Sequence, residues 1–247
     1  MFGLLDSLLV SLSRKDNGSV KKATELVSTN LSQNGKTLVC FLPEIMLRES
    51  ILGNKFLDSA RNVLAYMLSP RRVVRPNPSH TRELLENVYE DALLKVSSHD
   101  INPEDLIVLG ISLGNCPAYR FAAQTQAKRL ISVVPGSRLS ESIWESNVTR
   151  EQVKEAKRLG FKLEDFKEQL ISFNPIEYVS EISGHVEVYL GKYDRMIPYY
   201  LGRELALSLE EQSRSRTDLT VTTQTHNFGD HASTAYFFAR QFLKRRF

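Results

Sequence analysis

The segment DLIVLGISLGNCPAY, Asp105–Tyr119, places a serine between two glycines immediately after an apolar run. The run Leu106–Leu109 consists of branched aliphatic residues and follows the turn sequence INPED, which is typical of a short buried strand. We expect a helix to follow Ser112. The pattern Gly-Ile-Ser-Leu-Gly of residues 110–114 therefore lies at a turn from strand to helix, where a serine can serve as a nucleophile.

The two glycines of this pattern suit a tight turn, because a nucleophile at a strained corner leaves no room for side chains at neighbouring positions. The same residues also fit an ordinary glycine-containing turn in which Ser112 caps the following helix. The pattern alone leaves both interpretations open, so the rest of the sequence has to distinguish them.

Short apolar runs alternate with longer segments of helical periodicity along the rest of the 247-residue chain. This is the pattern of parallel strands joined by crossover helices, and the length suits one α/β domain over residues 1–247. The other expected strands are Thr37–Pro43, Arg71–Pro76, Leu130–Pro135, His185–Gly191 and Leu219–Thr225. Helices are expected after Thr37–Pro43 and at Ser79–Val96, Tyr200–Gln212 and Ala232–Arg246. The sequence predicts a mostly parallel sheet with helices on both faces.

Residues 136–183 lack a strand signal but contain two segments of helical pattern, TREQVKEAKRLG and LEDFKEQLISF. We expect a small helical cap inserted above the strand ends. Its aromatic residues Trp144, Phe161 and Phe166 are candidate substrate-binding residues, suited to an apolar acyl or aryl group. The alternative is that these rings only seat the cap on the core.

Charge and cysteine content narrow the class of protein. The chain has 32 basic and 29 acidic residues, and this balance, without a basic stripe, argues against nucleic-acid binding. Cys40 and Cys116 lie in apolar segments, which predicts buried free thiols and a reducing compartment. We expect a cytoplasmic protein, because no apolar run reaches transmembrane length and the first residues lack the features of a signal peptide.

A serine nucleophile needs a histidine base and an acid that orients the histidine, and both types follow Ser112 in the chain. Asp194 lies in YLGKYDRMIP, just after an expected strand, although an aspartate there also suits a plain turn. His231 lies in THNFGDHASTAYF, at the start of the last expected helix. His226 competes with it, but His231 is preferred because the preceding Gly229 leaves a flexible loop.

Three segments in this order resemble the α/β-hydrolase superfamily, over Gly35–Phe247. GISLGN resembles its nucleophile elbow, GKYDRMIP its acid-bearing turn, and GDHASTAYFFARQFL its histidine loop and closing helix. The resemblance implies an α/β-hydrolase fold with a catalytic triad of Ser112, Asp194 and His231. It implies no cofactor, and the other histidines show no spacing that would favour a metal site.

The expected oxyanion hole departs from the common pattern of that superfamily. One donor should be the backbone N–H of Leu113, and the other should come from the loop after Thr37–Pro43. Many relatives have His-Gly there, whereas this chain has Pro43 and Glu44. Proline has no N–H to donate, so the expected second donor is Ile45, with Glu44 as the less favoured alternative. Glu44 either faces away, binds a cationic part of the substrate, or marks a degraded site.

These observations predict a serine hydrolase that cleaves a carboxylic ester or thioester of a small molecule through an acyl-enzyme on Ser112. One alternative is amide or short-peptide hydrolysis on the same triad. The other, from a different class, is a binding protein that keeps the fold and has lost turnover.

The first fifteen residues, MFGLLDSLLVSLSRK, place leucines at helical spacing and predict an amphipathic helix over 1–15. We expect this helix to dock on the domain's own core. A second copy of the chain, giving a homodimer, and a membrane surface are the alternatives. The membrane is disfavoured because the segment has only two basic residues, both at its end.

Overall fold

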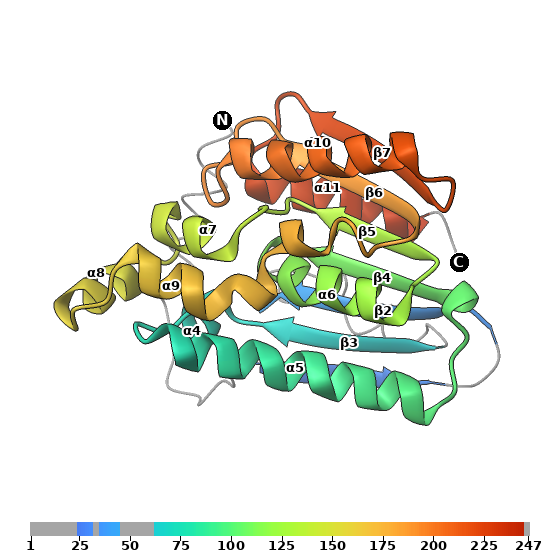
Figure 1. Ribbon diagram of the computed structural model, residues 1–247, viewed down its shortest axis with the longest axis horizontal. Helices are drawn as coiled ribbons and strands as arrows, with labels where there is room; N and C mark the ends of the chain where they lie inside the picture. The colour runs from blue at the N-terminus through green and yellow to red at the C-terminus, as the bar shows by residue number, and fades with distance from the viewer. Residues whose placement is uncertain (1–23, 32–34, 45–61, 245–247) are drawn as a thin grey trace.

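The computed structural model describes residues 24–31, 35–44 and 62–244 (Figure 1). Within these residues, seven strands form one sheet in the order β1-β3-β2-β4-β5-β6-β7. Strand β1 is antiparallel to β3, and every other neighbouring pair is parallel. The strands are β1 Thr24–Asn30, β2 Thr37–Pro43, β3 Val63–Leu68, β4 Leu106–Ile111, β5 Arg129–Val133, β6 Gly184–Gly191 and β7 Leu219–His226.

From β3 onward, helices connect the successive strands, and the described helices cover both faces of the sheet (Figure 1). They are α4 Pro70–Val73, α5 Pro78–Ser98, α6 Asn115–Thr125, α7 Leu139–Glu145, α8 Arg150–Arg158, α9 Leu163–Leu170, α10 Tyr199–Ser215 and α11 His231–Lys244. Short 3-10 turns are Pro103–Asp105, Ser112–Gly114, Ile171–Phe173 and Pro175–Tyr178. In Figure 1, α5, α6 and α10 lie on one face and α11 on the other.

The central strands are apolar at successive positions because each of their two faces packs against a separate core. Val39 and Phe41 of β2 belong to the core beneath α5 and α6, whereas Leu38 and Cys40 belong to the core that includes Ala235 of α11. All residues of β2 and β4 are buried. The predicted parallel α/β sheet is therefore confirmed.

One expected strand is wrong. Arg71–Pro76 does not form a strand; its first three residues belong to α4, which begins at Pro70. The strand is instead Val63–Leu68, a continuous apolar run between β1 and β2 in the sheet. Val73 and Val74 are buried because they pack on the core from the end of α4. Their β-branched side chains therefore reflect burial and not a strand.

Two other differences concern the beginning of the chain. Strand β1 was not expected; it is an edge strand with one neighbour, and TELVSTN has no strong apolar pattern. The amphipathic helix expected at 1–15 and the helix expected directly after β2 lie outside the described residues.

Helices α7, α8 and α9 lie between β5 and β6 in the chain, at the end of the sheet toward which β3 points (Figure 1). Arg138, just before α7, makes two hydrogen bonds of 2.6 and 2.7 Å with Glu204 of α10. The Ser137 hydroxyl donates to the same carboxylate at 2.6 Å, and Tyr200 donates to Glu145 at 2.6 Å. These contacts hold the start of the 136–183 segment against α10.

Candidate active site

Ser112 occupies the turn between β4 and α6. Its φ is +55°, in the left-handed region that residues with a side chain rarely adopt. Such a conformation costs free energy and persists where the surroundings hold it in place. The sharp corner lifts Ser112 away from the sheet at the carboxyl end of β4, as expected for a nucleophile elbow.

The two glycines beside Ser112 are required by close packing. A Cβ at Gly114 would lie 2.0 Å from the carbonyl oxygen of Phe41 in β2. A Cβ at Gly110 would lie 2.8 Å from both the Cβ of Ala118 and Oδ1 of Asn115. No side chain fits at either position, because both contacts are far inside van der Waals distance. Glycine is therefore needed at both positions because β2 and α6 pack directly against the turn.

Asp194 and His231 form a buried pair at the same end of the sheet. Nδ1 of His231 lies 2.7 Å from Oδ2 of Asp194, and the side chains are 9% and 5% exposed. The other carboxylate oxygen of Asp194 accepts hydrogen bonds of 2.9 Å from the backbone N–H groups of Met196 and Ile197. The carboxylate is therefore fixed by the backbone on one side and available to the imidazole on the other.

The loops that carry this pair are joined through their backbones. The N–H of Lys192 donates to the carbonyl of His226 at 3.2 Å, and the N–H of Tyr193 donates to that of Gly229 at 3.0 Å. A Cβ at Gly229 would lie 2.2 Å from Nδ1 of His226, so the histidine loop closes tightly. The loop after β6 and the loop after β7 therefore hold each other in place.

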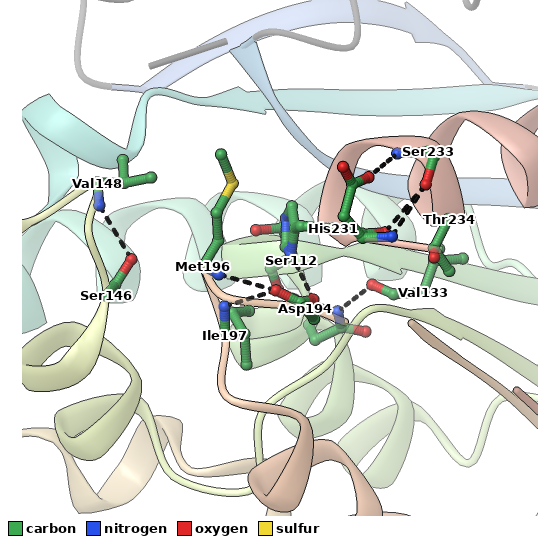
Figure 2. Close-up of polar contacts among 12 residues, drawn as sticks. Ser112, Val133, Ser146, Val148, Asp194, Met196, Ile197, His231, Ser233 and Thr234 are labelled. Carbon is green, nitrogen blue, oxygen red and sulfur yellow. Dashed lines mark hydrogen bonds and ion pairs between the residues drawn. The ribbon is translucent and has the colours of Figure 1, made fainter. Parts of the chain in front are cut away.

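Sheet register brings Ser112 to the same place. Ile111, the residue before it, is paired with Val133 of β5, which is paired with Tyr189 of β6. Because neighbouring strands lie about 4.8 Å apart, the ends of β4 and β6 are about 10 Å apart. Figure 2 draws Ser112 in the same region as Asp194 and His231, which a dashed line joins. The three predicted residues thus gather at one edge of the sheet.

The competing histidine has different partners. His226 stacks on Phe237, with ring centroids 5.2 Å apart, and its Nδ1 lies 3.5 Å from Oγ1 of Thr234. Asp194 pairs with His231 instead. Asp230 caps α11, since its Oδ1 accepts the N–H of Ser233 at 2.8 Å.

Of the two expected oxyanion donors, the structure describes one. Leu113 lies in the 3-10 turn directly after Ser112 and is buried. Ile45 lies outside the described residues. Glu44 follows β2 and is partly exposed, and it makes a polar contact of its own.

The three aromatic residues expected to bind substrate lie in the α7–α9 region but differ in exposure. Phe166 is 1% exposed and packs edge-to-face on Trp144, with ring centroids 5.3 Å apart. Trp144 and Phe161 are partly buried against the same core, and Lys157 lies 5.2 Å from the Trp144 ring. Phe166 is buried in this packing, and a substrate-binding role for any of the three rings stays a prediction.

The cysteines and the possible metal ligands offer no second site among the described residues. Cys40 and Cys116 are free and buried as predicted, and burial raises the pKa of Cys116 to about 12 and that of Cys40 further, which leaves neither as a nucleophile. Among the described residues, no group of three or more His, Cys, Asp and Glu side chains could hold a metal ion. No helix in this part of the chain has the length and apolar character needed to cross a membrane.

Sequence reasoning missed Asn115, whose side-chain amide is buried directly behind the Ser112 turn. The only signal was its place in the chain, immediately after the second glycine of the G-x-S-x-G pattern.

Neither a protein-family model nor a curated protein matches the sequence. Solved structures do. The capsule O-acetyltransferase of Neisseria meningitidis serogroup A is 16% identical with a TM-score of 0.58, and the match covers 95% of this chain and 98% of that one. The acetyl xylan esterase from Paenibacillus sp. R4 is 12% identical with a TM-score of 0.57, covering 99% and 94%.

A third similar structure, the acylaminoacyl peptidase of Pyrococcus horikoshii, is 14% identical with a TM-score of 0.54. That match covers 90% of this chain but 37% of the peptidase, so the chain spans little more than a third of that protein's length. All three share the architecture described above. The protein therefore has the α/β-hydrolase fold, as its sequence predicted.

Proposed function

We propose that the protein is a serine hydrolase that cleaves a carboxylic ester or thioester through an acyl-enzyme on Ser112. The observation that carries the proposal is the buried hydrogen bond of 2.7 Å between Nδ1 of His231 and Oδ2 of Asp194. A buried, aligned pair of this kind beside a strained serine has a clear chemical use, because it makes the imidazole a base of fixed tautomer and orientation.

The tautomer follows from the partners. Oδ1 of Asp194 accepts from two backbone N–H groups, which leaves Oδ2 to accept the Nδ1–H of His231. In that tautomer Nε2 carries no proton, and we propose that it takes one from the Ser112 hydroxyl. In the proposed reaction the Asp194 side chain orients His231 and stabilises the imidazolium that forms.

In the proposed reaction, Oγ of Ser112 bonds to the acyl carbon while His231 takes its proton, giving a tetrahedral oxyanion. The bond to the leaving group breaks, and His231 returns the proton to the departing oxygen or sulfur. Water then attacks the acyl-enzyme by the same two steps and releases the acid. The N–H of Leu113 would hold the oxyanion, with Ile45 as the proposed second donor.

An ester is favoured as substrate because the acetyl xylan esterase and the capsule O-acetyltransferase match over nearly the full length of both chains. Their names suggest a small acyl group on a hydroxylated acceptor. The peptidase match keeps amide or short-peptide hydrolysis as the alternative, on the same three residues. A protein that has kept the fold without turnover is the remaining alternative.

A fluorophosphonate probe tests the proposal. The intact protein should be labelled, and Ser112→Ala should abolish labelling, because the probe reacts with an activated serine. Ser98→Ala, an exposed serine at the end of α5, is the matched control and should be labelled like the intact protein. Failure of the intact protein to react would overturn the proposal.

A substrate panel then separates the alternatives. It should contain p-nitrophenyl esters of graded chain length, acyl thioesters and aminoacyl amides. Preference for an ester or thioester, lost in Ser112→Ala, supports the proposed activity. Preference for aminoacyl amides would replace it with the peptidase alternative.

A further inference from the structure

We propose that Asn115 is a positioning residue that aims the backbone N–H of Leu113 at the substrate oxyanion. The inference rests on the proposed function and adds to it a residue outside the triad. It comes from a buried hydrogen-bond network that adjoins the Ser112 turn.

The network begins at the side-chain amide of Asn115, which is 0% exposed. Nδ2 donates to the carbonyl oxygen of Ser112 at 3.0 Å and to that of Val133 at 2.9 Å. Oδ1 accepts from the hydroxyl of Ser132 at 2.8 Å, and Tyr119 donates to that hydroxyl at 3.1 Å. Every donor is matched to an acceptor, and the two carbonyl groups fix which end of the amide faces them.

Both carbonyl groups adjoin strained backbone. Ser112 itself has a φ of +55°, and Val134, directly after Val133, has a φ of +45°. For a β-branched residue this is a true outlier. Such conformations persist where the surroundings over-determine them. One side chain therefore holds two strained corners, the ends of β4 and β5, at a fixed separation.

The link to catalysis is the peptide plane between Ser112 and Leu113. The carbonyl oxygen of the first and the N–H of the second belong to one rigid plane and point in opposite directions. The side chain of Asn115 and its own backbone N–H both donate to that oxygen, so the Leu113 N–H must face away from Asn115. A donor held in advance stabilises a developing oxyanion without reorganisation.

Gly110 supports this interpretation. A Cβ at this position would lie 2.8 Å from Oδ1 of Asn115 and 2.9 Å from its Cα. The first glycine of the pattern thus makes room for the amide. We conclude that the Asn115 side chain helps to hold the Ser112 turn in its conformation.

The test is kinetic. Asn115→Ala should lower kcat on the best ester about 10- to 100-fold with little change in KM, because one oxyanion donor loses its orientation. The affinity of an arylboronic acid, which forms a tetrahedral adduct on serine, should fall by a similar factor. Asn115→Ser, which keeps one hydroxyl donor, should recover part of the loss.

Two further variants separate positioning from stability. Ser132→Ala leaves the Asn115 amide in place but removes the hydroxyl that donates to its Oδ1, so kcat should fall about 3- to 10-fold. This variant tests the proposal also in the case that the Asn115 variants do not fold. Tyr66→Phe removes another buried hydroxyl, which donates to Asp91, and should lower the melting temperature without changing kcat.

The outcomes are distinct. An unchanged kcat and boronate affinity in Ser132→Ala, or in a folded Asn115→Ala, would overturn the positioning role alone. An intact protein that neither hydrolyses esters nor reacts with fluorophosphonate would overturn the proposed function itself.

Discussion

His231 and Asp194 are joined by a hydrogen bond of 2.7 Å although 37 residues separate them in the chain. The carboxylate has no other role in the described fold than to accept this bond and the two backbone N–H groups of its own turn. The pair therefore gives a direct way to test the proposed chemistry without disturbing the core.

Asp194→Asn should lower kcat about 10⁴-fold with little loss of stability, because the amide can donate to Nδ1 and would select the wrong tautomer of His231. Steady-state kinetics and thermal unfolding measure the two effects. Asp230→Asn is the matched control, since asparagine caps a helix as well as aspartate does, and it should keep activity within a few-fold. Equal losses in the two variants would contradict the assigned acid.

Catalysis should also depend on pH. If a histidine is the base, kcat/KM should rise with pH through roughly pH 6 to 8, where histidine side chains lose their proton. The measurement uses an ester with a good leaving group in buffers of constant ionic strength. A rate that stays flat across this range would argue against a histidine base.

The positions of Ser112, Asp194 and His231 past the ends of strands could be predicted from the sequence, because each residue lies in a short local pattern that follows a strand. What failed were features set by distant contacts. The strand is Val63–Leu68, whereas the valines of Arg71–Pro76 lie at the end of a helical turn. A buried valine can pack on the core from a strand or from a helix, so the local sequence did not distinguish the two. Asn115 carried no pattern of its own, since its role depends on the carbonyl of Val133 on a neighbouring strand.

Glu204 should give a pH-dependent contribution to stability. Partial burial acts to raise the pKa of its carboxyl group, but hydrogen bonds from Ser137 and Arg138, with the charge of Arg138, bring that pKa below its usual value. A carboxylate with a lowered pKa stabilises the fold above the pKa it has when unfolded, and this contribution is lost as the pH falls through the folded value. Glu204→Gln should therefore lower the melting temperature at pH 7 by about 2–4 °C.

The difference in melting temperature between Glu204→Gln and the intact protein should shrink as the pH falls below about 4. Thermal unfolding at a series of pH values tests this. A difference that is the same at pH 7 and pH 3 would mean that the Arg138–Glu204 contact does not stabilise the fold through charge.

Gly114→Ala should be severely destabilising because the new Cβ would lie 2.0 Å from the Phe41 carbonyl oxygen, so β2 would have to move away from the serine turn. A loss of about 3 kcal/mol or more in the free energy of unfolding is expected, as for other overpacked buried sites. Gly160→Ala is the comparison, because its Cβ meets nothing within 4 Å and only its φ of +90° opposes the change. Denaturant unfolding should show a much smaller loss there, and equal losses would contradict the steric argument.

The two histidines of the loop after β7 should behave oppositely. His231→Ala should lower kcat about 10⁴-fold or more, since it removes the proposed base. His226→Ala should keep kcat within a few-fold but lower the melting temperature, because the ring stacks on Phe237 and packs against the backbone of Gly229. Kinetics and thermal unfolding of both variants, with fluorophosphonate labelling of Ser112, separate the roles. If His226→Ala were inactive and His231→Ala active, the base would be His226, and the buried pair with Asp194 would be a structural contact.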